Sequence, residues 1–590
     1  MLKSVPPIRT AAHYGIPLDL GGCSSLFTLT LRVHIYIASK QKLKQILWCN
    51  CDDTGNGSLP CETRESLPPS EYRLVGNRTM QQGGKQEPVS SGTSTDTNTE
   101  KDVEGGNTTA TTATIPTDES SEVLDPHIVG WNGPDDAENP KNWSSAKRWS
   151  HIILVAMLGL VTNFAPTIFA PGISQLNEEF QITSSTISTL AITLYVLGIS
   201  IGPMFTSPLS EVYGRLVVYH GSMILFVVFV IANAVSQNTA EFLVFRFLSG
   251  CAGGTPLALG GGTIADVSKL AQRALAMALF SLGPMFGPVL GPVIGGFVAS
   301  AKGWRWTFWV LAMVGGGMQL ISFAIMRETH PKVILDNKAA RLRKSSGNPN
   351  FRSKLARTTT PAQVLLQVLV RPTTLLFRSP ILLLMSLYMG FIFGVMYLLF
   401  STFDAVFQVQ YGFSVAVSGL VYLGLGLSAA TGIVFFTIFN PRIQAALMKR
   451  DGVTTVKPEH RLVLMIWFSP GVPAGLFIYG WATYYKVHWF VPILGTVLIG
   501  YGAFFVLMLT QLYLVELFGT KAAASALGAN ILVRYLGGTF LPLAGPSMYA
   551  TLGLGWGNSL LGFVSLAFIP ASIFLYKYGE QLRNKSTVKV

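Results

Sequence analysis

The stretch Gly283-Pro-Met-Phe-Gly-Pro-Val-Leu-Gly-Pro-Val-Ile-Gly-Gly296 lies inside an apolar run from about Ala274 to Ser300. Glycine recurs every fourth residue, and a proline follows the first three of these glycines. In a helix this spacing places the missing side chains on one stripe, where a neighbouring helix can approach to backbone distance. Three internal prolines would each cost a water-soluble helix about 3 kcal/mol, whereas a membrane helix tolerates them because its neighbours satisfy the freed carbonyls. The stretch therefore predicts a closely packed membrane helix. Its marker residues are Gly283, Pro284, Gly287, Pro288, Gly291, Pro292, Gly295 and Gly296.

The composition supports a protein that crosses the membrane many times. The 590 residues are 49% hydrophobic and only 12% charged, which excludes an ordinary soluble enzyme. The net charge of +13 comes from basic residues in the connections between apolar runs, so membrane topology explains it without a nucleic-acid partner. The 5 cysteines show no metal-binding spacing, and we expect neither a metal nor a cofactor.

Twelve apolar runs are long enough to span a bilayer, which predicts an all-α membrane protein of twelve transmembrane helices in two six-helix bundles. The expected runs are 150–172, 184–207, 217–236, 241–264, 274–300, 304–326, 380–403, 414–439, 461–481, 488–510, 522–546 and 555–577. We expect five regions: a disordered cytoplasmic N-terminal tail (1–149), a first bundle (150–326), a basic cytoplasmic central loop (327–379), a second bundle (380–577) and a cytoplasmic C-terminal tail (578–590).

The distribution of charge predicts the orientation of the spans. The central loop carries eleven Lys or Arg residues against Glu328 and Asp336, and the shorter loops alternate in the same sense. Cytoplasmic loops are enriched in basic residues. The bias therefore places the central loop and both termini in the cytoplasm.

Two short motifs flank the spans of the first half. Glu211 and Arg215 stand four residues apart on either side of Gly214, so a tight turn can hold opposite charges against two helix ends; the alternative is an ordinary solvated loop. In the fourth span Arg246 precedes Gly250, and the span ends at Asp266. An arginine inside a span costs about 2.5–3.5 kcal/mol on insertion scales. Arg246 is therefore expected to face the protein interior, with snorkelling to the surface as the alternative.

These motifs resemble those of the major facilitator superfamily, and within it the fungal twelve-helix drug:proton antiporters. Pro208-Leu-Ser-Glu-Val-Tyr-Gly-Arg215 resembles the signature between spans two and three, Arg246 and Gly250 resemble the fourth-span signature, and the Gly283–Gly296 stretch resembles the antiporter signature. The sequence departs from the family at Leu216, where a second arginine is usual. The resemblance implies a proton-driven exporter of lipophilic or cationic drugs, polyamines or secondary metabolites, working by alternating access. We expect the protein to be a monomer.

The charged residues leave the coupling mechanism open. No Asp or Glu lies near the middle of a predicted span; the candidates for a coupling residue are Glu211, Asp266, Asp404 and Glu516, at span ends or in loops. In one interpretation, an Asp at a span end pairs with Arg246 or Arg534 and exchanges that pairing for a proton. In the other, the two arginines attract an anionic metabolite. The candidates for the substrate cavity are Asn163, Tyr195, Tyr388, Tyr397, Asn530 and Arg534.

Other functional classes fit the sequence less well. The 8 histidines show no paired metal or nucleophile spacing, which argues against a membrane-embedded enzyme, and no Gly-Lys-Ser/Thr phosphate loop is present. A nutrient-uptake facilitator of the same fold remains the main rival, because fold does not fix function. The expected partners are a small-molecule substrate, protons and the lipid bilayer. The expected location is the plasma membrane, with the vacuolar membrane as the alternative.

Overall fold

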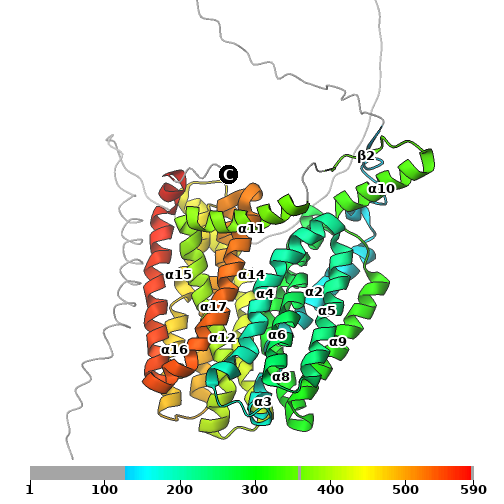
Figure 1. The fold of residues 1–590 in the computed structure, drawn as a ribbon. Helices are drawn as coiled ribbons and strands as arrows, with labels where there is room; N and C mark the ends of the chain where they lie inside the picture. The colour runs from blue at the N-terminus through cyan, green and yellow to red at the C-terminus, as the bar shows by residue number, and fades with distance from the viewer. Residues whose placement is uncertain (1–126, 357–360, 586–590) are drawn as a thin grey trace, which may run out of the picture. The chain divides into compact units, whose positions relative to one another are not determined.

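A computed structural model describes residues 127–356 and 361–585 of the chain. Residues 1–126, which form most of the predicted N-terminal tail, and residues 586–590 lie outside the described part. The described chain is almost entirely helical, and its long helices stand side by side (Figure 1).

The first bundle contains six spans. They are α2 (Ser145–Phe164), α4 (Ser185–Tyr213), α5 (Arg215–Val235), α6 (Thr239–Gly253) continued by α7 (Thr255–Val267), α8 (Leu270–Lys302) and α9 (Trp304–Ile325). A 3-10 turn, η2 (Ala170–Gly172), and the short α3 (Ile173–Glu179) connect α2 to α4. Consecutive spans can join through one residue because Gly214 (φ 95°) and Gly303 (φ 88°) adopt a backbone conformation that side chains disfavour.

The second bundle also contains six spans. They come from α12 (Pro380–Tyr411), α13 (Val415–Ser418) with η3 (Gly419–Tyr422) and α14 (Leu423–Asp451), η4 (Pro458–Arg461) with α15 (Leu462–Phe468) and α16 (Gly471–Tyr484), and α17 (Phe490–Lys585). The 96 residues of α17 form three spans, because Gly519 and Gly553 have non-helical backbone angles. The prediction of twelve spans in two bundles is confirmed.

Length and apolar composition alone identify 10 membrane-spanning helices in the described residues. One of the 10, Ala522–Arg583, is 62 residues long and is divided into two spans at Gly553. The twelfth span is α2, whose 20 residues begin with the polar sequence Ser-Ala-Lys-Arg.

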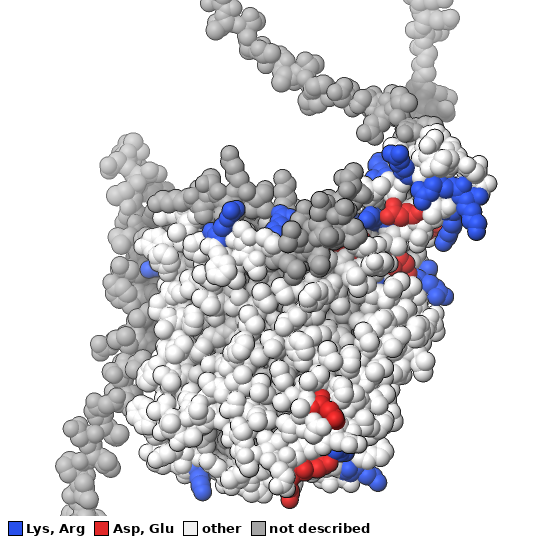
Figure 2. Space-filling view, viewed as in Figure 1, with Lys and Arg blue, Asp and Glu red and all other residues white. Residues whose placement is uncertain are grey.

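Two faces of the molecule are used as reference below. The terminal face carries α10 (Pro331–Ser346) and α11 (Pro361–Arg378), and the opposite face carries α3 (Figure 1). Because successive spans alternate in direction, η4 belongs to the terminal face and the turns at Gly303 and Gly412 belong to the opposite face. On the side shown in Figure 2, Lys and Arg gather on the terminal face over α10, while few charges lie on the opposite face. The basic residues of α10 are Lys332, Lys338, Arg341, Arg343 and Lys344.

The end of the predicted tail is ordered, which corrects the expectation of disorder for residues 127–149. Strand β1 (Ile128–Val129) pairs in parallel with β2 (Arg352–Ser353) of the central loop. Lys338 of α10 forms an ion pair with Asp136 at 3.1 Å. Backbone N–H groups of Asn132 and Glu138 also bind this carboxylate, and together these contacts lower the pKa of Asp136. The tail therefore becomes an ordered part of the terminal face before α2 begins.

Candidate functional site

The glycine stripe of α8 packs against α2. A Cβ atom at Gly283 would lie 2.9 Å from the backbone nitrogen of Leu160, and one at Gly287 would lie 2.5 Å from Cβ of Asn163. Further along the helix, Gly291 faces Thr167, and Gly295 faces the carbonyl of Ile168. The fifth span thus approaches the first span and the turn that follows it to backbone distance over about three helical turns, as the spacing of four predicted.

A side chain in the turn after the first span satisfies a carbonyl that proline frees on α8. Pro292 has no N–H, so the carbonyl of Pro288 lacks its helical donor. The hydroxyl of Thr167 donates to this carbonyl over 3.2 Å. This contact is the compensation that a proline-containing membrane helix requires from its neighbours.

A second face of α8 contacts the other bundle. Near the opposite face, Gly296 approaches the carbonyl of Val415 on α13, and Gly419 at the start of η3 approaches the carbonyl of Pro292. Deeper in the bundle, Gly426 faces Val289. The helix therefore lies in the seam between the two bundles, in contact with the first span on one side and the eighth on the other.

Arg246 joins three spans of the first bundle and is only 1% exposed. It donates from Nε to the carbonyl of Ala191, from Nη1 to that of Ala165 and from Nη2 to that of Pro166, at 2.8, 2.8 and 3.1 Å. Three aromatic rings surround its guanidinium, those of Phe169, Tyr195 and Phe308, at 4.6–5.6 Å. The expectation that Arg246 faces the interior matches this arrangement. Each of its three nitrogens thus donates to a backbone carbonyl, so in this conformation Arg246 connects parts of the first bundle.

Most of the expected cavity residues are buried between helices. The exposed fraction is 3% for Asn163, 0% for Tyr195, 1% for Tyr388, 2% for Tyr397 and 0% for Asn530. The Tyr195 hydroxyl donates to the carbonyl of Thr162, and Asn530 donates to the Ser386 hydroxyl. The Tyr388 ring stacks on Phe568. In this conformation these side chains connect helices and do not line an open surface.

Arg534 differs from the other five because it is only half-buried. Its guanidinium lies 5.0 Å from the ring centre of Phe393 and 4.6 Å from that of Tyr535. Its Nε is buried and has no hydrogen-bond partner in the described structure. A half-buried cation among aromatic rings, with one donor unused, is suited to bind a polar group on a flat apolar molecule.

The motif between spans two and three forms an ion-pair site on the terminal face. Arg215 donates from Nε to Asp266 over 2.6 Å, and both side chains are 15% exposed. Glu328, which follows the sixth span, accepts from the backbone N–H groups of Arg215 and Leu216 at 3.1 and 3.0 Å. A carboxylate on the first N–H groups of α5 also complements the helix dipole. Leu216, where the family has arginine, contributes its backbone N–H to this site.

This geometry corrects one interpretation of the sequence. Asp266 pairs with Arg215 and not with Arg246 or Arg534, because it lies at the terminal-face end of α7 while both other arginines lie inside spans. Gly214 leaves room for the Glu328 carboxylate, and Gly262 leaves room for the Arg215 guanidinium. Glu211, half-buried on the last turn of α4, belongs to the same face.

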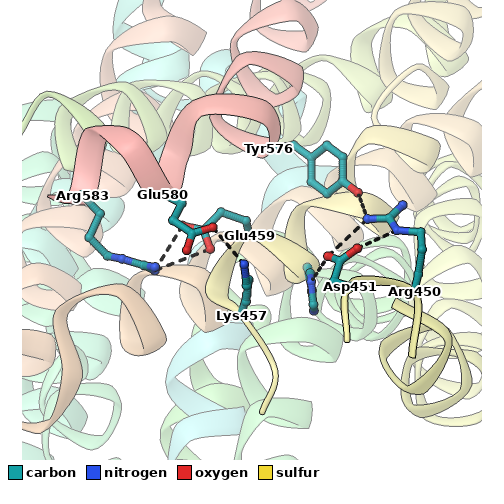
Figure 3. Close-up of polar contacts among 8 residues, drawn as sticks. Arg450, Asp451, Lys457, Glu459, Tyr576, Glu580 and Arg583 are labelled. Atoms are coloured by element: carbon teal, nitrogen blue, oxygen red, sulfur yellow. Dashed lines mark hydrogen bonds and ion pairs between the residues drawn. The ribbon is translucent and has the colours of Figure 1, made fainter. Parts of the chain in front are cut away.

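The second bundle contains a similar ion pair between neighbouring spans. Arg461, at the start of the ninth span, pairs with Glu516, near the end of the tenth, at 2.6 Å. Figure 3 shows the neighbouring network, in which Glu459 pairs with Arg583 at 3.1 Å and Lys457 pairs with Glu580 at 2.9 Å. The terminal ends of both bundles are therefore tied by cross-span ion pairs.

One pocket of about 540 Å³ lies outside the bundles. Its lining includes Trp131, Lys338 and Phe351, from the ordered tail and the central loop. It contains none of the residues expected to bind substrate or protons, and we assign it no role.

Comparison with known proteins places this arrangement in a family. The model of the Major Facilitator Superfamily matches residues 155–542. The chain belongs to the major facilitator superfamily. Members of this family are transporters, so the chain is a membrane transporter and not an enzyme.

Named relatives of this transporter are fungal transporters. The MFS transporter prlG of Fungal sp. (strain NRRL 50135) is 51% identical over 469 residues, which cover 79% of this chain and 98% of the relative. The efflux pump radE of Floropilus chiversii is 42% identical, over 82% of this chain and 90% of the relative. Among solved structures, a D-xylose-proton symporter matches with a TM-score of 0.56 at 18% identity, over 73% of this chain and 98% of that one. At this identity the structural match supports the fold alone.

Reasoning from sequence missed several residues of the facilitator's polar sites. The sequence indicates Glu328 only as a charge of the central loop, and it gives no sign that Arg461 has an acidic partner. A comparison of the two halves could have found the second pair, because Arg215 and Arg461 both begin a span and Asp266 and Glu516 both lie near the end of the next one. The partners of Asp404, described below, carry no comparable signal.

Proposed function

We propose that this transporter exports a lipophilic small molecule from the cytoplasm in exchange for protons, and that its terminal face lies on the cytoplasmic side. The substrate class we favour is a fungal secondary metabolite, and lipophilic or cationic drugs and polyamines are the other members of the expected range. The position of α8 carries the proposal. The stretch that resembles the antiporter signature contacts the first span through its glycines and the eighth span through Gly296. A helix in that seam can form the sliding surface of two bundles that rock against each other.

Two further observations support this function. Basic residues collect on the terminal face, as is usual for a cytoplasmic face. One relative with 42% identity is named an efflux pump, and it is covered over 90% of its length. An exporter is therefore a better match than the uptake facilitator, although both share the fold.

Arg534 favours a second candidate, the export of an anionic metabolite. Arg246 already donates to three backbone carbonyls, whereas the buried Nε of Arg534 has no hydrogen-bond partner among the described residues. Its aromatic neighbours suit a flat apolar body that carries one acidic group. The variant Arg534→Gln separates the two candidates, because it should abolish export of an anionic compound and spare export of a cationic one.

The test uses the full chain in a host cell and in sealed vesicles. Cells that express the transporter should accumulate less of the cationic dye rhodamine 6G than cells with an empty vector, and dissipating the proton gradient should remove the difference. In reconstituted vesicles, dye movement should drive an opposite movement of protons, followed with a pH-sensitive dye. If neither dye nor an anionic fluorophore is exported and nutrient uptake rises on expression, the uptake facilitator is the correct assignment.

A further inference from the structure

Asp404 is an acidic group buried inside the seventh span. It lies seven residues before the end of α12, or about 10 Å along the helix, and is only 3% exposed. Its carboxylate contacts two hydroxyls of the eighth span: that of Ser418 at 2.7 Å and that of Tyr422 at 2.8 Å. Among the described residues no Lys, Arg or His forms an ion pair with it, and the other titratable group that faces it is Tyr479 of the ninth span. A buried carboxylate with no cation is costly if it is ionised.

Counting protons around Asp404 indicates which form is present. The Tyr422 hydroxyl also lies 2.7 Å from the carbonyl of Phe400, and the Ser418 hydroxyl lies 3.0 Å from the carbonyl of Val415. A hydroxyl has one proton, so two hydroxyls supply two protons for four short oxygen contacts. With an ionised carboxylate, the Tyr422 oxygen would face either the carboxylate or the Phe400 carbonyl with no proton between them. A proton on the carboxyl group removes this conflict: Asp404 donates to Tyr422, and Tyr422 donates to Phe400.

A third side chain connects this acid to the other bundle. Gln408, one turn beyond Asp404 on α12, donates from Nε2 to the Ser418 hydroxyl at 3.0 Å. The same amide donates to the carbonyl of Pro171 in η2 of the first bundle at 3.2 Å. The hydrogen bonds therefore run from the first bundle through Gln408 and Ser418 to Asp404. They close the seam at the opposite face, beside the contact of Gly296 with Val415.

We propose that Asp404 is a proton-binding residue of this transporter and that its neutral form closes the seam at the opposite face. When the bundles separate there, Pro171 leaves Gln408 and water reaches the carboxyl group, which then exchanges its proton with the solution on that side. A carboxylate disfavours reclosure, because closing would bury a charge without a counterion. Binding of a proton permits closure, so proton uptake is linked to the conformational change. The inference rests on the proposed proton antiport for its physiological meaning.

The test measures the opening of the seam directly and needs no substrate. Spin labels are placed at Lys302→Cys and Lys486→Cys, exposed positions on the opposite face of the two bundles, in the full chain without its native cysteines. Distances between the labels are measured in lipid nanodiscs from pH 5 to pH 8.5. We expect a short distance at low pH and a longer distance at high pH. Asp404→Asn should hold the short distance at every pH, while Glu178→Gln, which removes an exposed carboxylate on α3 of the same face, should follow the parent protein.

A second variant keeps the proposal testable if Asp404→Asn fails to fold. Gln408→Leu leaves the acid in place and removes its connection to Pro171. Because closure is linked to proton binding, each tenfold weakening of closure should lower the midpoint of the transition by about one pH unit. A distance that does not depend on pH in the parent, or an unchanged pH response in Asp404→Asn, would overturn the inference.

The outcome separates this inference from the proposed function. A pH-dependent seam without proton-coupled dye export overturns antiport and leaves the role of Asp404 in closure intact. Proton-coupled export of rhodamine 6G that persists in Asp404→Asn overturns the role of Asp404 and leaves antiport intact.

Discussion

Thr167, in the turn that follows the first span, donates a hydrogen bond to the carbonyl of Pro288 on the fifth span, the carbonyl that Pro292 leaves without a helical donor. This bond connects the unusual sequence of α8 to its place in the fold. Pro292 leaves the Pro288 carbonyl free at the level where Gly291 lets the neighbouring segment approach. That segment, the first span and the turn after it, supplies both the packing surface and the hydroxyl donor.

Thr167→Val should therefore destabilise the transporter by about 1–3 kcal/mol, because it keeps the shape of the side chain and leaves the Pro288 carbonyl unsatisfied. The thermal midpoint of the protein in detergent measures the loss. Thr167→Ser retains the hydroxyl and is the matched control. Equal midpoints for the valine and serine variants would show that the bond contributes nothing.

Gly287→Val should prevent correct packing of the first and fifth spans, because its Cβ would lie 2.5 Å from Cβ of Asn163. Clashes of this kind in a packed interior cost about 1–3 kcal/mol or more. The measurement is the yield of monodisperse protein in size-exclusion chromatography. Gly316→Val on α9 is the control, since no other heavy atom lies within 4 Å of a Cβ placed there. If both variants behave alike, the close approach is not required.

Arg246→Lys should lose most transport and stability although the charge is kept. A lysine has one ammonium group and cannot reach the three carbonyls that the guanidinium binds in one plane. We expect a large drop in both the thermal midpoint and the dye export rate. Lys302→Arg, on the exposed end of α8, is the matched control for a Lys/Arg exchange. A fully active Arg246→Lys protein would mean that the carbonyl contacts are dispensable.

Asp266→Asn should weaken the terminal-face site without removing Glu328 from the start of α5. The Arg215 guanidinium then loses its counterion. Because both side chains of this pair are only 15% exposed, its loss should destabilise the conformation in which the pair forms. Proton-driven dye export is the readout. If export remains fully intact, Asp266 has no role in coupling. Asp336→Asn, on α10 of the same face, controls for loss of one negative charge.

Asp136→Asn should loosen β1 from the central loop. The pKa of Asp136 is lowered by the N–H groups of Asn132 and Glu138 and by Lys338. A lowered pKa means that this stabilisation is fully present above the unfolded value of about 3.9 and is lost as the pH falls through the folded value. Hydrogen exchange of the segment 127–142 at pH 7 should therefore be faster in the variant. Asp135→Asn changes the adjacent exposed residue, and it should leave exchange unchanged.

The amino-acid sequence was enough to predict the number of spans, their division six and six, and a close approach of the fifth span to its neighbours. These properties follow from hydropathy over about twenty residues and from the period of glycine on α8, which are local. It also indicated that Arg246 faces inward, because the cost of a lipid-exposed arginine does not depend on its neighbours.

Which polar groups meet depends on the tertiary packing of the helices. Asp266 reaches Arg215 and not a span arginine, and Glu328 binds the start of α5 from 113 residues away. Asp404 shares two hydroxyls with the next span, and Gln408 joins it to the first bundle. Such contacts depend on how helices rotate and cross, and packing across the bundles sets those rotations. No period in the sequence encodes these contacts. The sequence could therefore predict that polar sites exist, but not which residues pair in them.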